Sequence, residues 1–503
     1  MSHLPRVAVV GGGIAGLAAA WKLLGRADVT VYELAGRVGG KLAVTELSGV
    51  SGPVAVDAGS ESVLARRPEA LTLAREVGLG EDLVFPATAD ARVFTGGGLH
   101  RLPPGTVLGV PTRVDAPGMD GLFGPAELAR IAAEPDLGPD GLTATLAAGG
   151  DVAIGELVGR RMGDAVVDRL VEPLLGGVYA GRARELSLQL TSPALAAALR
   201  TEPSLLRAAA AVAGLPVAAT SASPVPAGTV PVGTVPAGPV PAGTGTPVFA
   251  GIRGGIGRLP VAVAEALAER GVAVRDSTAV RGLRRTPDGW ALTVGPVPRE
   301  RVEAFDAVVL AVPAPPAARL LGSVAPAASA ELAGIAYASV ALVHLAVPAA
   351  VGAGLAGSSG VLVPPVEGLT VKAATWSSLK WDWVREGAPD TLVLRASVGR
   401  AGDEADVARP DGELVDTVLA DLSRLTGAGF DRAALVDARV TRWGGGLPQY
   451  PVEHAARVGR IRSALAGYPT LAVCGAAYDG VGIPACIASG RAAASALVLD
   501  LRP

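Results

Sequence analysis

The fold of this chain is decided by the stretch Val7-Ala-Val-Val-Gly-Gly-Gly-Ile-Ala-Gly-Leu17. The apolar run predicts a strand, and a helix is expected from about residue 13 to 24. Gly11, Gly13 and Gly16 have the spacing G-x-G-x-x-G, which permits a tight turn, a close approach of backbone to a pyrophosphate, and close packing of helix on strand. The helix would direct its N-terminal N–H groups and the positive end of its dipole at that phosphate.

A second apolar strand is expected at residues 29–33, and it ends in Glu33. A carboxylate at this position suits hydrogen bonds from an adenosine ribose. Because strand, glycine loop, helix, second strand and acid come in the order that a dinucleotide-binding unit requires, we expect a bound ligand and not a bare glycine turn.

The residues after Glu33 indicate which dinucleotide the chain binds. Arg37-Val-Gly-Gly-Lys41 follows, and then Asp57-Ala-Gly-Ser-Glu61. A glycine pair lets the backbone pass beside a cofactor, and Arg37 and Lys41 can offset phosphate charge. The pattern E-x-x-x-R-x-G-G-[RK] followed by D-x-G resembles the amine-oxidase-like flavoproteins, which bind FAD.

A second strand, loop and helix near the other end of the sequence are expected to close the same site. Residues 471–475 are typical of a short buried strand, and an Ala-rich helix is expected from about Pro484 to Leu499 because proline favours the first helical turn. The N-terminus of this helix could face the flavin pyrimidine ring, where its positive dipole end would favour the reduced flavin anion.

Three further segments resemble one family, the HemY-type porphyrinogen oxidases. The run Gly480-Val-Gly-Ile-Pro-Ala-Cys-Ile-Ala-Ser-Gly490 is similar to their G-V-x-[LI]-x-x-C-I-x-S-G signature. Residues 99–105 resemble their L-[HY]-x-[LM]-P-x-G loop, and residues 171–187 resemble their P-x-x-x-G-[VI]-[YF]-[AS]-G…L-S segment. Trp443 stands where the family has a tryptophan against the flavin. The match runs from about residue 6 to 500 apart from one insertion.

The resemblance implies a non-covalent FAD site. Cys474 and Cys486 are expected to be small core residues and not flavin attachment points, because both lie in apolar runs. The candidate FAD residues are Gly11, Gly12, Gly13, Ile14, Ala15, Gly16, Glu33, Leu34, Arg37, Gly40, Lys41, Gly59, Ser60, Glu61, Val280, Trp443, Gly475, Val481, Gly482 and Ile483.

The family's reaction removes three hydrides from a porphyrinogen in two-electron steps, with dioxygen as acceptor and hydrogen peroxide as product. The flavin carries this chemistry, so no catalytic side chain is assigned, and His100 and His344 are expected to be surface or core residues. A tetrapyrrole carries carboxylates, which favours arginines at the pocket mouth. The candidate substrate residues are Arg66, Arg67, Gly177 and Tyr179.

Several functional alternatives remain open. Composition and resemblance favour coproporphyrinogen III, with protoporphyrinogen IX as the alternative within the family. A flavin amine oxidase, a carotenoid desaturase and a non-catalytic flavoprotein are more distant alternatives. Transient handover of product to the next haem-pathway enzyme and the oligomeric state are left open.

Composition excludes other classes. A net charge of −3 over 503 residues gives no nucleic-acid footprint, and 4 His and 2 Cys leave no metal cluster or disulfide framework. No signal peptide precedes the first strand, so a cytoplasmic location is expected.

No residue between Arg207 and Arg253 is charged, but the dense prolines of this segment forbid a membrane-spanning helix, so an extended surface insertion is expected. Peripheral membrane contact is left open.

The expected architecture is α/β, with a Rossmann-type FAD-binding domain, an interleaved antiparallel-sheet substrate domain and a helical lobe. Helical patterning covers about residues 155–175 and 193–213. Adjacent strands are expected at 272–275 and 277–280, and a further apolar strand at 306–313. Antiparallel strands are expected at 339–347, 369–376 and 392–398. The FAD domain is expected from residues 1–90, 250–313 and 441–503, the lobe from 91–213, the low-complexity insertion from 214–249 and the substrate domain from 314–440.

Overall fold

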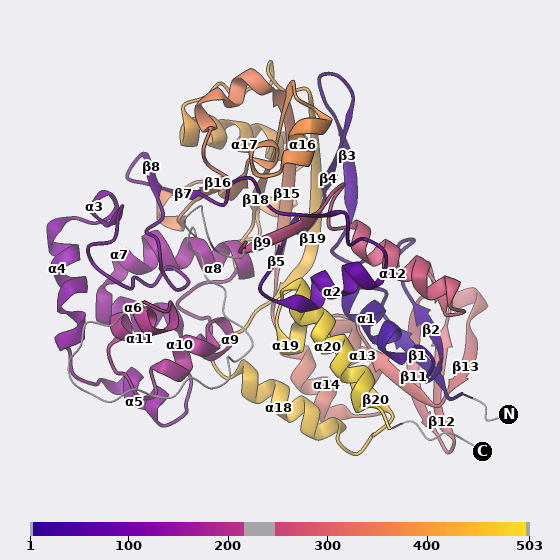
Figure 1. Ribbon diagram of the computed structural model, residues 1–503. Coiled ribbons are helices and arrows are strands. Elements are labelled where there is room, and N and C mark those ends of the chain that lie inside the picture. The colour runs from indigo at the N-terminus through magenta and orange to yellow at the C-terminus, as the bar shows by residue number, and fades with distance from the viewer. Residues whose placement is uncertain (1–3, 216–246, 499–503) are drawn as a thin grey trace.

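The computed structural model describes residues 4–215 and 247–498. It is mixed α/β, as expected, and Figure 1 shows a parallel sheet with helices at the lower right, a long antiparallel sheet above the centre and a helical lobe at the left. Residues 216–246, most of the expected insertion, lie outside the described residues. None of the helices in the described ranges combines the length and the apolar character needed to cross a membrane.

The parallel sheet has the strand order β10-β2-β1-β14-β20. β1 (Arg6–Val10) lies between β2 (Asp28–Tyr32) and β14 (Ala307–Leu310), while β10 (Ala273–Arg275) and β20 (Leu471–Val473) form the edges. The strands are mostly apolar because both faces of the sheet are covered. The expected strands at these places are confirmed, with small shifts at their ends.

Alternate side chains of β1 face the two covering layers. Val7 and Val9 pack on α1 (Ile14–Leu23), α2 (Pro68–Glu76), α12 (Arg258–Glu269) and α20 (Ile483–Ala496). Ala8 and Val10 pack on the other layer, which consists of β11 (Val280–Thr286), β12 (Gly289–Val294), β13 (Arg301–Phe305), α13 (Ala314–Leu321), α14 (Pro326–Ala333), α18 (His454–Leu465) and α19 (Ala476–Asp479).

The second large sheet has seven strands and is antiparallel except where β16 meets β7. One face packs on α17 (Asp411–Thr426). The three strands expected in this sheet are confirmed, and the first of them, expected at 339–347, is part of a longer strand that spans Tyr337–Pro348. In sheet order the strands are β19 (Asp437–Pro448), β15 (Tyr337–Pro348), β18 (Thr391–Val398), β17 (Val371–Thr375), β16 (Gly360–Leu362), β7 (Ala91–Thr95) and β8 (Gly98–Arg101).

A hairpin, formed by residues 44–57, and several short elements join the two sheets. The apolar residues of the hairpin, together with Trp381 and Val384, pack on the seven-stranded sheet at Ala346 and Val393. This packing holds the segment from Asp57 onward against that sheet. The joining elements are β3 (Val44–Ser48), β4 (Pro53–Asp57), β5 (Val63–Leu64), β6 (Leu83–Val84), β9 (Phe249–Ile252), α15 (Ser377–Lys380) and α16 (Asp382–Gly387).

The helical lobe has its own apolar core. Its helices are α3 (Met119–Leu122), α4 (Pro125–Ala133), α5 (Gly141–Ala147), α6 (Ile154–Met162), α7 (Asp164–Val166), a π-helical turn (Val167–Val171), α8 (Glu172–Tyr179), α9 (Leu188–Thr191), α10 (Pro193–Ala198) and α11 (Leu205–Val212).

The helical patterning is confirmed over both ranges, but neither range is one continuous helix, and one expected strand is wrong. The first range breaks at Gly163, which has φ +105°, and the second breaks before Ser204 because Pro203 follows α10. Ser277 has φ 47°, so the strand expected at 277–280 begins only at Val280 and pairs antiparallel with β12, outside the parallel sheet.

Candidate functional site

The first glycine loop has the backbone that its spacing predicts. Gly11 has φ +113°, and a Cβ on Gly16 would lie 1.9 Å from the carbonyl oxygen of Gly11. Gly13 is the N-cap of α1 and provides no side-chain cap, and a Cβ built on it meets no atom within 4 Å. The chain therefore leaves open space before the uncapped N-terminus of α1, which fits a phosphate.

Glu33 lies against this loop. Its carboxylate accepts hydrogen bonds from the backbone N–H groups of Gly12 and Ala35, each at 2.8 Å. A carboxylate offers about four acceptor positions, so capacity remains for ribose hydroxyls. The backbone leading to Val280 is close by, since the N–H of Thr278 donates to the Glu33 carbonyl oxygen at 2.8 Å. Leu34 is exposed beside them.

The second glycine loop packs on the first. The N–H of Gly39 donates to the Gly12 carbonyl oxygen at 2.8 Å, and Gly40 has φ +57°. The guanidinium of Arg37 donates to the carbonyl oxygens of Gly40 and Leu42, at 2.8 and 3.2 Å. Through these hydrogen bonds, Arg37 stabilises the conformation of its own loop.

Lys41, Gly59 and Trp443 come together from distant parts of the sequence. A Cβ on Gly59 would lie 1.9 Å from the Lys41 carbonyl oxygen and 3.7 Å from the Trp443 ring. The indole N–H of Trp443 donates to the Ala58 carbonyl oxygen at 3.0 Å. Burial lowers the pKa of Lys41, and within the described residues its ammonium has no ion pair. A half-buried cation without an ion pair among the described residues fits an anionic ligand.

The loop between β20 and α20 joins the same region. Gly475 has φ +117° and donates its N–H to Ser489 at 3.0 Å. A Cβ on Gly490 would lie 2.0 Å from the Ala15 carbonyl oxygen, so α20 packs closely on α1, as Figure 1 shows. Gly482 is the N-cap of α20 without a side-chain cap, and Ile483 begins the helix.

Neither cysteine is suited to covalent attachment of the flavin. Cys474 and Cys486 are both buried. Burial raises the pKa of the Cys486 thiol to about 11 and raises that of Cys474 as well. Both thiols stay protonated at neutral pH, which supports a non-covalent cofactor. Within the described ranges, no three His, Cys, Asp or Glu residues are grouped as metal ligands.

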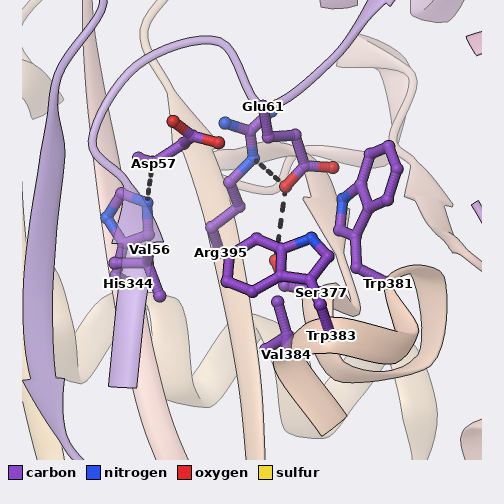
Figure 2. A pocket seen from close by; sticks show the side chains of 9 residues that line it. All are labelled: Val56, Asp57, Glu61, His344, Ser377, Trp381, Trp383, Val384 and Arg395. Carbon is purple, nitrogen blue, oxygen red and sulfur yellow. Dashed lines mark hydrogen bonds and ion pairs between the residues drawn. The ribbon is translucent and has the colours of Figure 1, made fainter. Parts of the chain in front are cut away.

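Glu61 is an ion-pair residue that ties its loop to the large sheet (Figure 2). Its carboxylate lies 2.6 Å from Lys380 Nζ and 3.3 Å from Arg395 Nε, and Ser377 Oγ donates to it at 3.3 Å. Burial alone would raise its pKa, but Arg395 and Lys380 outweigh burial and lower the pKa to about 2. Sequence reasoning missed Lys380 and Arg395, which lie on elements remote from Glu61 in the chain. Ser60 is exposed, and its hydroxyl donates to the Ser62 carbonyl oxygen at 3.1 Å.

We expect this ion pair to stabilise the fold in a pH-dependent way. A carboxylate whose folded pKa is about 2 and whose ordinary value is 4.5 adds stability above pH 4.5 and loses it as the pH falls through 2. The contribution is about 3 kcal/mol. The difference in unfolding free energy between wild type and Glu61→Gln, measured by urea unfolding, should therefore shrink between pH 4.5 and 2. A difference that stays constant over that range would contradict the ion-pair assignment.

Asp57 and His344 line the other side of the cavity in Figure 2, whose volume is about 10 Å³. The carboxylate of Asp57 accepts from the N–H groups of Ile256 and Gly257, both at 2.9 Å, just before α12. Burial raises its pKa to about 7. Burial lowers the pKa of His344 to about 4, and its Nε2 lies 2.8 Å from the Asp57 carbonyl oxygen. These groups hold the segment before Gly59 in place.

The candidate substrate residues fall into two places. Tyr179 is buried, with its ring centroid 5.9 Å from that of Tyr450, and Ala180 beside it packs with Val340 and Trp443. Gly177 is exposed on α8. Arg67 is paired with Glu69 at 2.5 Å, and Arg66 is exposed. Within the described residues, neither arginine has an ion pair or hydrogen bond to the Tyr179 region.

Known proteins resemble the chain over nearly its whole length. Residues 14–498 match the family described as flavin containing amine oxidoreductase. The coproporphyrinogen III oxidase of Mycobacterium tuberculosis is 38% identical over 494 residues, covering 97% of this chain and 96% of that protein. The coproporphyrinogen III oxidase of Bacillus subtilis is 30% identical over 500 residues, covering 97% of each chain.

Solved structures agree. A crystal structure from Exiguobacterium sp., assigned as a protoporphyrinogen oxidase, has a TM-score of 0.78 and 29% identity, covering 98% of this chain and 99% of that chain. Cyclohexylamine oxidase from Brevibacterium oxydans has a TM-score of 0.65 and 16% identity, covering 98% of each chain, which is a likeness of fold alone. The chain belongs to the flavin-containing amine oxidoreductases, is FAD-dependent, and falls within their porphyrinogen oxidase branch.

Proposed function

We propose that this protein oxidises coproporphyrinogen III to coproporphyrin III, with protoporphyrinogen IX as the alternative substrate. The observation that carries the proposal is the 38% identity to the M. tuberculosis coproporphyrinogen III oxidase across 97% of this chain. The amine oxidase alternative rests on fold likeness at 16% identity, which gives no argument about substrate.

The glycine loops and the two uncapped helix starts fit an extended dinucleotide. We propose that Gly11 to Gly16 and α1 hold the pyrophosphate, that Glu33 and Val280 hold the adenylate half, and that Lys41, Gly59 and Trp443 adjoin the flavin. When bound, FAD supplies the two-electron acceptor for each hydride that leaves a bridging carbon. The other proposed contacts are Leu34, Arg37, Gly40, Ser60, Glu61, Gly475, Val481, Gly482 and Ile483.

The task of the chain itself is to bind the macrocycle and exclude water. Apolar packing around Ala180, Val340 and Trp443 joins α8 of the lobe to the face of the large sheet that carries Trp443. Val481, from the loop before α20, packs against the core of the lobe. The substrate is proposed to lie where these three parts meet, beside Gly177 and Tyr179.

No side chain is proposed as a general base. His344 has a pKa near 4 and its Nε2 faces a backbone carbonyl oxygen, so it is poorly suited to carry a proton at neutral pH. His454 is buried with its Nε2 2.9 Å from the Ala477 carbonyl oxygen, and burial lowers its pKa. Protons from the pyrrole nitrogens are proposed to leave to solvent.

The proposal also covers the final electron acceptor, the cellular location and the anchors for the substrate carboxylates. Dioxygen is proposed as the final acceptor, with hydrogen peroxide released in three two-electron turnovers per porphyrin. We also propose a cytoplasmic location and handover of product to a following haem-pathway enzyme. The division of the chain into six segments stays part of the proposal. Arg66 and Arg67 are proposed as anchors for substrate carboxylates.

We expect kcat/KM for coproporphyrinogen III to exceed that for protoporphyrinogen IX by about tenfold or more. Four propionates can form more charge-assisted pairs than two, and each such pair is worth about 1.5–3 kcal/mol. The test is aerobic incubation of the yellow holoprotein with each porphyrinogen, following porphyrin fluorescence and peroxide against an enzyme-free control. Equal efficiencies would reject the substrate preference, and no rate above the control with either compound would reject the proposed function.

A further inference from the structure

Lys372 occupies an irregular position in the large sheet. Val371 pairs with Val398 and Ala373 pairs with Ser397, so Lys372 is an extra residue at a β-bulge in β17. Val371 and Ala374 both pack into the core against α17. The bulge therefore places Lys372 and Ala373 on the opposite face, and α8 packs against β16 and β17.

The side chain of Lys372 is buried, and its ammonium has no partner among the described residues. The residue is 3% exposed, and within the described residues its Nζ has no hydrogen bond and no carboxylate within 4.0 Å. Burial, together with the nearby Arg400, lowers the pKa of Lys372 to about 7. Because a buried cation is costly unless it is paired, this arrangement points to an anion that is supplied from outside the chain.

Arg400 adds a second positive charge at this place. Its Nη2 donates to the Val363 carbonyl oxygen at 3.1 Å, which leaves other N–H groups of the guanidinium available. Glu172 and Asp403 influence Arg400 electrostatically, but within the described ranges no carboxylate lies within 4.0 Å of it. Glu172 already accepts the Ala183 N–H at 2.7 Å.

The remaining charged groups near this place are few. Arg182 and Asp168 act on Glu172, and Arg182 Nε donates to the Ala401 carbonyl oxygen at 3.3 Å. Among the described residues, the buried Lys372 and the half-buried Arg400 thus lie near one half-buried carboxylate, that of Glu172, which is engaged elsewhere, while Asp403 is exposed. The local charge is suited to one further carboxylate.

Lys372 and Trp443 lie on the same face of the sheet. Trp443 pairs with Val340, and both pack with Ala180 at the end of α8, on the face opposite α17. β15 and β18 lie between β19 and β17, so an interstrand spacing of about 4.8 Å puts the two positions about 14 Å apart across the sheet. A ring held beside Trp443 could direct a side chain toward Lys372 beneath α8.

We propose that Lys372 and Arg400 bind one carboxylate of the substrate, a propionate on the side of the macrocycle away from the flavin. This inference rests on the proposed function and assigns a specificity-determining pair within it. A carboxylate between the two cations forms charge-assisted hydrogen bonds with both, whereas an uncharged vinyl group in that place would leave both cations unpaired.

The test compares Lys372→Met and Lys372→Arg with Lys22→Met, a matched control on the exposed surface of α1. FAD-loaded proteins are titrated with coproporphyrin III and with its tetramethyl ester, which has no carboxylates, and binding is followed by porphyrin fluorescence. We expect Lys372→Met to lose about tenfold of the wild-type preference for the free acid. Lys372→Arg should keep most of that preference, and Lys22→Met all of it.

The outcomes separate the two levels of proposal. If wild type binds the free acid and oxidises coproporphyrinogen, but Lys372→Met keeps the full preference for the acid, the carboxylate site is wrong and the proposed function stands. If wild type binds neither porphyrin and oxidises no porphyrinogen, both are wrong. Thermal unfolding is used to check that Lys372→Met is folded, which is expected because methionine has similar length and no charge to bury.

Discussion

Gly13→Val should abolish FAD binding while the protein still folds. Gly13 has φ −70° and ψ 170°, which valine adopts readily, and a Cβ there meets no protein atom within 4 Å. The added branches would fill the space where we place the pyrophosphate. Loss of its hydrogen bonds, each about 1.5–3 kcal/mol, should raise the Kd for FAD by about 100-fold or more.

The measurement is the absorbance ratio of flavin to protein after purification, followed by titration of the apoprotein with FAD. Gly459→Val is the matched control, since Gly459 is exposed on α18 and its Cβ also meets nothing within 4 Å. The control should retain full flavin. Full occupancy in Gly13→Val would reject the assignment of this loop to the pyrophosphate.

Glu134→Ala should destabilise the helical lobe by about 3–5 kcal/mol. Glu134 and Arg161 are 0% and 1% exposed and form an ion pair of 2.5 Å. The carboxylate also accepts from Ser204 Oγ and from the N–H groups of Leu205 and Leu206 at the start of α11. Its loss leaves the buried Arg161 charge with only the more distant Asp140, at 3.9 Å, as a counterion, and it removes the acceptor of the Leu205 and Leu206 N–H groups.

The measurement is urea unfolding at neutral pH with FAD in excess, so that cofactor loss does not change the comparison. Glu331→Ala is the matched control because Glu331 pairs with Arg460 at 2.6 Å on the exposed surface. It should shift the midpoint little, since solvent screens exposed pairs. Equal shifts in the two variants would show that burial of the Glu134 pair contributes nothing.

Local elements were predictable because their signals are local. The apolar run before Gly11, the three glycines and the acid at Glu33 specify β1, the loop, α1 and β2 from neighbouring residues alone. The helix breaks at Gly163 and before Ser204 were missed, although a glycine at positive φ and a proline are also local signals. The proposed FAD contacts follow from these motifs and stay a prediction.

By itself the sequence determined the α/β class, the glycine loops and the family, because each depends on short motifs whose spacing constrains the backbone directly. Only the tertiary structure decided the charged pairs. Glu61 pairs with Lys380 at the end of α15 and with Arg395 on β18, and a bulge in β17 sets the face on which Lys372 lies near Arg400. A one-residue change of register would turn Arg395 and Lys372 to the other face of the sheet, so no local pattern can specify which charges lie near one another.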